Sequence, residues 1–350
     1  MIKNTLLLLL LAISVLFSCS EKETIDPDTI SIKSGGVFIT NEGNFSTANS
    51  SLSYYYPETF EISNNLFYKA NNVPLGDVAQ SITINNNMIY LVINNSGLVY
   101  GVNRETLEYE GKINGLISPR EMIFIDNNKA YISDLYSTEI TVANPNTFEI
   151  TGSIELRKSS DCMVKSGSKI FAANWSMLNQ TKLNNTVMVI DSENDMLVDS
   201  IIVGIEPNSM ATDKDGSLWV LCSGGFMNNE VPTLWKINIA SLEILKTYTV
   251  GEIMQSPDNL CINGSGDSLY FLNSGVYSMS IYDQVLPNNA IISESSHNYY
   301  SLGIDPKTSE IYISDALNYN QNGVVYRYNS TGEMISSFDV GIIPGSFGFN

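Results

Sequence analysis

Short amide and carboxylate side chains recur at the ends of seven apolar runs along this chain. Each run holds one aromatic residue: Phe38, Tyr90, Tyr131, Phe171, Trp219, Tyr270 or Tyr312. Three positions later, five runs carry Asn41, Asp134, Asn174, Asn273 and Asp315, and the other two carry Asn94 and Ser223 one position further on. Such groups can hydrogen-bond amides or hydroxyls of a ligand. Alternatively, they merely end strands, because Asn and Asp tolerate turn geometry.

Long polar segments with aromatic side chains follow four of these runs, at 41–50, 174–185, 223–233 and 315–323. Aromatic planes mixed with amide groups suit a large, flat, amide-bearing ligand. Residues that begin other strands on the same face extend the set. The candidate ligand-binding residues are Asn41, Glu42, Phe45, Asn94, Arg120, Asp134, Tyr136, Asn174, Trp175, Asn208, Ser223, Phe226, Asp258, Asn273, Asp315 and Tyr319.

The spacing of the aromatic residues predicts the elements that position this set. Successive aromatic residues are 40 to 52 residues apart, which is the period of a four-stranded propeller blade. The segment 80–113 divides into four short runs, 80–85, 88–94, 98–103 and 107–113, separated by turns rich in Asn or Gly. We therefore expect an all-β, seven-bladed propeller with four-stranded antiparallel blades over residues 34–350.

A repeated proline marks the start of several inner strands, at Pro119, Pro207, Pro257 and Pro344. Proline fits there because the first residue of a strand needs no ladder donor. The first aromatic run has no inner strand before it. We therefore predict that the C-terminal segment 346–350 closes blade 1, which removes free sheet edges.

The N-terminal residues predict export and lipidation. A charged start and an apolar stretch too short to span a bilayer precede Leu16-Phe17-Ser18-Cys19, which resembles a bacterial lipobox. This predicts a signal peptide over 1–18, lipidation of Cys19 and an acidic tether over 19–33, as in surface-exported lipoproteins. The alternatives are an ordinary secretory signal and a tether without an export role.

Composition excludes several classes of function. A formal net charge of −19 argues against nucleic-acid binding, which needs a basic surface. Besides Cys19 there are only Cys162, Cys222 and Cys261, without zinc-site spacing, and we expect these to be small buried residues. The single histidine, His297, reads as a solvated loop residue rather than a catalytic base. No catalytic or metal-binding residue is predicted.

One segment carries a resemblance to a known family. The residues Gly36-Val37-Phe38-Ile39-Thr40-Asn41-Glu42-Gly43-Asn44, followed by Ser51-Leu52-Ser53-Tyr54-Tyr55, resemble YncE-like propellers of Bacteroidetes and within them the BtuG-type surface lipoproteins. The resemblance implies capture of a corrinoid (cobalamin or cobinamide) as ligand, without another cofactor, and delivery to an outer-membrane TonB-dependent transporter. It also implies a lipid-anchored position at the cell surface.

Two other classes of function fit the same residues. A propeller lactonase would hold calcium with residues such as Glu42, Asn174 and a central Asp, because hard cations take carboxylate and carbonyl oxygens. A protein- or glycan-binding scaffold would use the aromatic loops as anchors for its partner.

Overall fold

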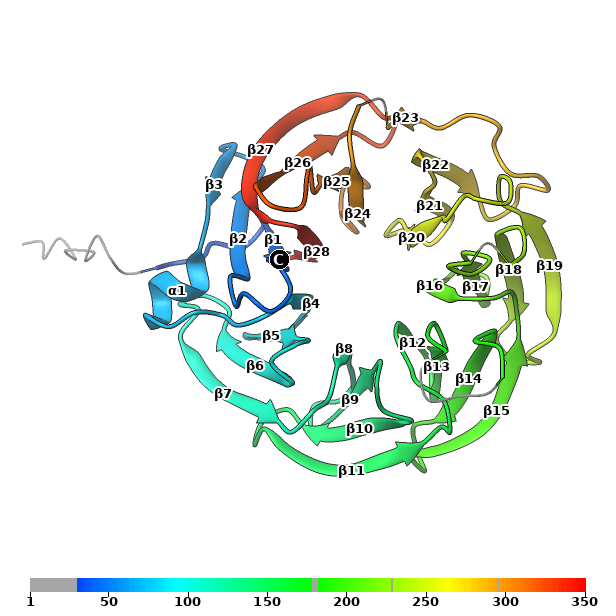
Figure 1. Cartoon of the computed structure of the whole chain (residues 1–350), viewed down its shortest axis with the longest axis horizontal. Helices are drawn as coiled ribbons and strands as arrows, with labels where there is room; N and C mark the ends of the chain where they lie inside the picture. Colours follow the sequence, from blue (N-terminus) through cyan, green and yellow to red (C-terminus); the bar gives the residue numbers. More distant parts are fainter. Residues whose placement is uncertain (1–29, 178–181, 228, 295) are drawn as a thin grey trace, which may run out of the picture.

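The computed structural model describes residues 30–177, 182–227, 229–294 and 296–350, and these form a ring of seven four-stranded antiparallel sheets (Figure 1). The predicted seven-bladed propeller is confirmed. The signal peptide, Cys19 and most of the predicted tether lie outside the described residues. None of the described helices has the length and apolar character needed to cross a membrane.

The four strands of each blade follow one another from the centre of the ring outward. Blade 1 contains β28 (Pro344–Phe349), β1 (Val37–Asn41), β2 (Ser51–Tyr56) and β3 (Glu61–Ser63). Blade 2 contains β4 (Ala79–Asn85), β5 (Met88–Ile93), β6 (Leu98–Asn103) and β7 (Tyr109–Asn114). Blade 3 contains β8 (Pro119–Asp126), β9 (Lys129–Asp134), β10 (Glu139–Asn144) and β11 (Glu149–Glu155). Blade 4 contains β12 (Met163–Ser166), β13 (Lys169–Ala173), β14 (Thr186–Asp191) and β15 (Met196–Ile202).

The remaining blades follow the same order. Blade 5 contains β16 (Pro207–Thr212), β17 (Ser217–Cys222), β18 (Thr233–Asn238) and β19 (Ile244–Thr249). Blade 6 contains β20 (Asp258–Ile262), β21 (Ser268–Leu272), β22 (Gly275–Ser280) and the two-residue β23 (Ile292–Ser293). Blade 7 contains β24 (Tyr299–Ile304), β25 (Ile311–Asp315), β26 (Asn322–Tyr328) and β27 (Met334–Ile342).

The periodic aromatic residues all lie in the second strand of a blade and are buried. Trp219, for example, has no exposed surface, and every residue of its strand β17 is buried. Neighbouring blades cover both faces of these strands, which is why they read as continuous apolar runs. The outermost strands are instead mostly exposed, with few buried residues, such as Gly111 and Ile113 in β7.

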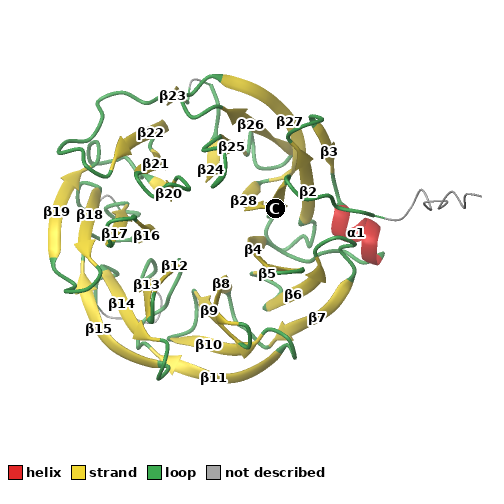
Figure 2. Cartoon of the chain, turned by 180° about the vertical axis from the view of Figure 1, so that it is seen from behind, coloured by secondary structure: helices red, strands yellow, loops and turns green. Residues whose placement is uncertain are grey.

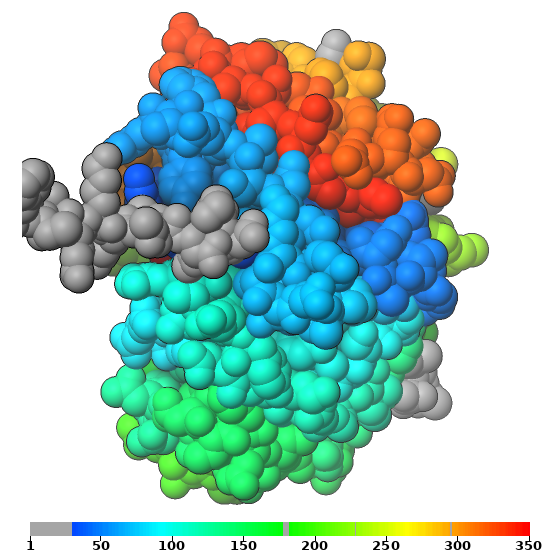
Figure 3. Space-filling model, turned by 90° about the vertical axis from the view of Figure 1, so that its left-hand side faces the viewer, coloured from blue at the N-terminus to red at the C-terminus, as the bar shows by residue number. Residues whose placement is uncertain are grey.

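Strand β28 closes the ring by pairing antiparallel to β1, with Val37 opposite Phe349 and Ile39 opposite Phe347. The predicted closure is confirmed, and the strand begins two residues earlier than expected, at Pro344. The two ends of the propeller therefore lie side by side in one sheet (Figures 1 and 3).

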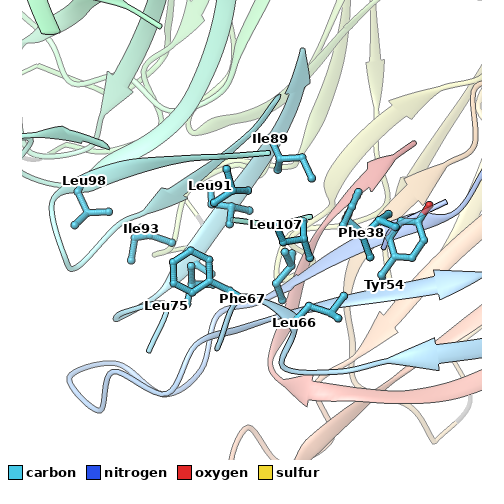
Figure 4. Packing of buried hydrophobic residues seen from close by; sticks show 14 residues of the cluster. Phe38, Tyr54, Leu66, Phe67, Leu75, Ile89, Leu91, Ile93, Leu98 and Leu107 are labelled. Atoms are coloured by element: carbon cyan, nitrogen blue, oxygen red, sulfur yellow. The ribbon is translucent and has the colours of Figure 1, made fainter. Parts of the chain in front are cut away.

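The junction of blades 1 and 2 is filled by an apolar cluster that includes the helix α1 (Leu66–Asn71), which lies at the outside of the ring (Figure 2). Phe67 and Leu75 pack there beside Phe38 and Leu91 (Figure 4). Ile32, from the end of the predicted tether, is buried in the same cluster, and its backbone N–H donates to the Glu105 carbonyl in the turn after β6. The last residues of the tether are thus part of the folded domain.

Candidate ligand-binding site

All inner strands begin, and all second strands end, at one face of the ring. The pairing of Pro119 with Asp134 and of Tyr299 with Asp315 shows this for blades 3 and 7. We call this face the mouth face. The polar residues that follow the aromatic positions do lie together there, as predicted, and we call them the strand-end ring: Asn41, Asn94, Asp134, Asn174, Ser223, Asn273 and Asp315.

The strand-end ring is buried, with exposed fractions between 0 and 9%. Asp134 shows why. Its Oδ2 accepts the backbone N–H groups of Ile117 and Ser118, and its Oδ1 accepts those of Tyr136 and Ser137. One carboxylate therefore fixes two loops from neighbouring segments of the chain.

The other members of the strand-end ring also form hydrogen bonds with neighbouring loops and strands. Asn41 donates to the hydroxyls of Ser51 and Ser53 and accepts the N–H of Gly341. Partners of the remaining residues are Ser118 for Asn94, Ser159 for Asn174, Glu206 for Ser223, Gln255 for Asn273, and Asn298 and Leu317 for Asp315. These seven side chains bond to loops, and none of them lines the central cavity. Their contact with a ligand stays a prediction.

A cavity of about 910 Å³ lies at the centre of the ring and is lined by the inner strands. Six of the seven inner strands carry an irregularity in their pairing with the second strand at the mouth end. At each one, a residue has no partner in register. These residues are Gln80, Arg120 with Glu121, Asn208, Asn259 with Leu260, Tyr300 and Gly345. A β-bulge bends the strand and re-aims a side chain, and bulges occur often beside functional sites.

The bulges bring polar side chains to the cavity wall, together with three residues from the adjoining loops and strand ends. We call this set the mouth ring: Glu42, Gln80, Arg120, Asp161, Asn208, Asp258, Asn259 and Tyr300. Of these, Glu42, Arg120, Asn208 and Asp258 were predicted from the sequence. The others were missed, and every blade contributes to the ring.

Blade 1 supplies its member of the ring through a glycine. A Cβ atom at Gly345 would lie 2.6 Å from Oε1 of Glu42, so a larger residue there would force the Glu42 side chain to move. The Tyr300 hydroxyl donates to Oε2 of Glu42 at 3.0 Å. The Glu42 side chain is therefore held over the end of blade 1 from the side of blade 7.

Arg120 links three blades at the mouth. Its Nε lies 2.8 Å from Oδ1 of Asp161, and its Nη1 donates to Oε1 of Gln80 at 2.6 Å. The guanidinium carbon also lies 5.7 Å from the ring centre of Trp175, within the range of a cation–π contact. Among the described residues, Arg120 is the only basic side chain that lines the cavity.

Burial changes the acidity of the carboxyls at this site. It raises the pKa of Glu42 to about 7, against the opposing effects of the Tyr300 hydrogen bond and Arg120. It likewise raises the pKa of Asp258 to about 6 and that of Glu121 to about 7. Near neutral pH the cavity therefore presents both hydrogen-bond donors and acceptors on carboxyl groups.

The aromatic candidates lie on the mouth face in two environments. Trp175 and Tyr319 line the central cavity. Phe45, Tyr136 and Phe226 are exposed by 70, 50 and 88% on the loops after β1, β9 and β17. Phe226 and Trp175 also border a smaller apolar hollow of about 300 Å³. The predicted aromatic loops therefore surround the mouth, although only part of the set touches the cavity.

Three smaller expectations change. His297 is a packed residue, because its Nδ1 lies 3.1 Å from Oδ2 of the buried Asp315 and its ring stacks on Tyr299. Cys162 and Cys261 line the cavity, whereas Cys222 is buried as expected. Of the residues considered for a calcium-dependent lactonase, Glu42 lines the cavity and Asn174 does not. No cluster of three or more His, Cys, Asp or Glu suitable for a metal is found in the described ranges.

Residues 35–343 match a family described as a domain of unknown function, DUF5074, and the chain belongs to that family. No curated protein matches the chain. The family match and the fold leave the finer resemblance to BtuG-type proteins as a prediction.

Several solved structures share the fold at low identity. The quinonprotein alcohol dehydrogenase-like protein of Bacteroides thetaiotaomicron is 13% identical, with a TM-score of 0.68 over 90% of this chain and 78% of that chain. The periplasmic gluconolactonase of Pseudomonas aeruginosa is 11% identical, with a TM-score of 0.67 over 90% and 99%. Hydrazine synthase of Kuenenia stuttgartiensis is 14% identical, with a TM-score of 0.61 over 77% and 88%. At these identities the likeness shows a shared propeller fold.

Proposed function

We propose that this member of the family is a capture protein that binds a corrinoid at the mouth face without chemical change. The observation that carries the proposal is the mouth ring, a closed circle of amide, carboxyl, guanidinium and phenol groups around a deep cavity. A corrinoid carries amide side chains around a flat macrocycle. Each primary amide offers both a donor and an acceptor, and the mouth ring offers both in return.

The loops around the mouth suit the macrocycle itself. Trp175 and Tyr319 stand at the cavity wall, and Phe45 and Phe226 are exposed around it. Large exposed aromatic side chains on a face of this kind are typical of binding sites. In the proposed complex the flat ring lies across the mouth, its amide side chains reach the mouth ring, and the aromatic loops contact its faces and edges.

The predicted export signal supports a position of this capture site outside the cell. We propose that Cys19 is lipidated, that the protein is anchored in the outer membrane at the cell surface, and that it delivers its ligand to a TonB-dependent transporter. Cys19→Ala should release the protein from the membrane fraction. Protease treatment of intact cells should degrade the wild-type protein, and protection from the protease would contradict the surface position.

Calorimetric titration of the purified protein with cyanocobalamin and with dicyanocobinamide tests the capture proposal. We expect saturable binding of at least one of them. Absence of heat with both at micromolar protein, confirmed by equilibrium dialysis, would overturn it.

A pair of aromatic variants locates the site. Trp175→Ala should weaken binding by about thirtyfold, because aromatic anchors commonly contribute roughly 2 kcal/mol. Phe60→Ala is the matched control: Phe60 is also an exposed aromatic residue, but it lies in the turn after β2, away from the mouth face. Equal affinity of the two variants would place the ligand elsewhere.

A further inference from the structure

Mouth-ring side chains on different blades differ in how many protein hydrogen-bond partners they have. On the side of blades 2 to 4, Gln80 Oε1 and both oxygens of Asp161 accept from Arg120. Each of these oxygens therefore already accepts at least one hydrogen bond. That side also presents the Glu121 carboxyl, which accepts the Met163 N–H, and the N–H donors of the Gln80 amide and the rest of the Arg120 guanidinium.

On the opposite side of the ring, at blade 6, the cavity wall presents a carboxyl without a basic partner. Asp258 lines the cavity and, among the described residues, forms no ion pair. Its neighbour Asn259 supplies a side-chain hydrogen bond, and the Asn259 amide also donates to the Tyr300 carbonyl. Much of the acceptor capacity of the Asp258 carboxyl is thus left for a ligand, and the described part of the cavity wall contains no second basic side chain to balance it.

We propose that Asp258 makes the mouth ring selective for a neutral amide, or an ammonium group, over a carboxylate at the same position of the ligand. This inference rests on the proposed function and names the chemical form of the ligand that the site accepts. An amide at the blade 6 position donates its N–H to Asp258, while other carbonyl groups of the ligand accept from the donors of blades 2 and 3. A carboxylate at the blade 6 position has no N–H to donate to Asp258, and it places a like charge beside that residue.

The size of the selectivity follows from two losses that act together. The carboxylate form leaves the Asp258 acceptor unpaired at the cavity wall, and it adds repulsion between two like charges. Sites built to hydrogen-bond a ligand donor reject analogues without it strongly. We expect the acid form to bind at least tenfold more weakly than the amide form.

Two matched ligand pairs test this. The first is cyanocobalamin and its monocarboxylic acid derivatives, in which one side-chain amide is hydrolysed, compared by calorimetry at pH 8. The second is nicotinamide and nicotinate, small probes compared by saturation-transfer NMR, which need no corrinoid binding. In each pair the wild-type protein should favour the amide, for at least one of the corrinoid acids in the first pair.

The variant Asp258→Asn should reduce the preference to a few-fold, because the neutral amide no longer repels the acid form. Asp199→Asn is the control for net charge, since Asp199 is exposed on the outer strand β15 and should leave the preference unchanged. Equal binding of amide and acid forms by the wild type, or a preference that survives Asp258→Asn, would overturn the selectivity alone. Failure of every probe to bind would overturn it together with the capture proposal.

Discussion

Two rings of polar residues lie on the same face of this propeller but differ in their surroundings. The strand-end ring is buried and its Asn, Asp and Ser side chains are bound to loop backbone and side chains. The mouth ring contains the same kinds of residue, yet its side chains line an open cavity. In blades 2 to 7 the two rings are one strand apart, whereas in blade 1 Glu42 directly follows Asn41. Residue type therefore does not decide whether a polar side chain anchors a loop or lines the cavity; the course of the local backbone does.

Removal of residues 346–350 should have the largest effect on stability. It removes the strand that pairs with β1, whose end carries Asn41 of the strand-end ring and precedes Glu42 of the mouth ring. These residues form most of β28, and Gly345 just before them makes room for Glu42. Without β28, blade 1 loses its inner strand and leaves the inner edge of β1 exposed. We expect a fall in melting temperature of more than about 10 °C, or loss of folding. An unchanged melting curve would contradict closure by β28.

Asp134→Ala should be the most costly single change in the strand-end ring. It leaves four backbone N–H groups, one of them buried and three partly buried, without this acceptor, and we expect a loss of about 3 kcal/mol in the free energy of unfolding, measured with urea. The comparison is Asp258→Ala, which removes the same residue type from the mouth ring and should not destabilise the fold. Similar losses for the two variants would erase the distinction between the rings.

The stability of the mouth ring should depend on pH in the direction set by burial. The folded-state pKa of Asp258 is about 6, above its ordinary value of 3.8, so its contribution to stability is greatest below pH 4 and is lost as the pH rises to about 6. Asp258→Asn removes this loss. The variant should be about 1–2 kcal/mol more stable than the wild type at pH 8, less than the full pKa shift implies because the carboxyl faces an open cavity.

Thermal or urea unfolding at pH 4 and pH 8 measures this effect, and the gain should vanish at pH 4. A gain of equal size at both values would show that it does not come from ionisation. Asp199→Asn controls for the change in net charge.

The smallest expected effect separates two asparagines. Asn208→Ala, in the mouth ring, should weaken cyanocobalamin binding about fivefold and barely change stability, because one amide hydrogen bond is worth about 1 kcal/mol. Asn94→Ala, in the strand-end ring, should lower stability by about 1 kcal/mol and leave the affinity of the folded protein intact. Calorimetry and urea unfolding on both variants decide the matter, and an exchange of the two phenotypes would contradict the assignment.

Much of the fold could be predicted because buried second strands must be apolar on both faces. Trp219 and its counterparts therefore recur at blade spacing, and the proline at 344 indicated the closing strand. Part of the mouth ring could also be predicted, since Arg120 and Asn208 each follow a proline that begins an inner strand. Gln80 and Tyr300 have no such proline before them, and nothing in the local sequence marks them.

There is a physical reason why it was harder to predict which polar side chains face the cavity and which are buried against loops. In a regular strand, alternation decides which face a side chain occupies, but a bulge shifts that alternation by one residue. The bulges beside Gln80 and Tyr300 depend on pairing with a strand that comes later in the chain. The burial of Asp134 likewise depends on a loop before β8, which folds over it only in the complete blade.

The position of β1 in the closed blade also has a mechanical consequence. A pulling force applied through the N-terminal segment reaches β1 soon after the chain enters the domain, and β1 is bonded on one side to β28 and on the other to β2. The component of such a force along β1 loads both ladders of hydrogen bonds in shear, so they must break together instead of opening one bond at a time. A protein held by its N-terminus in a flowing or crowded medium is thereby attached at a part of its ring that resists being pulled open.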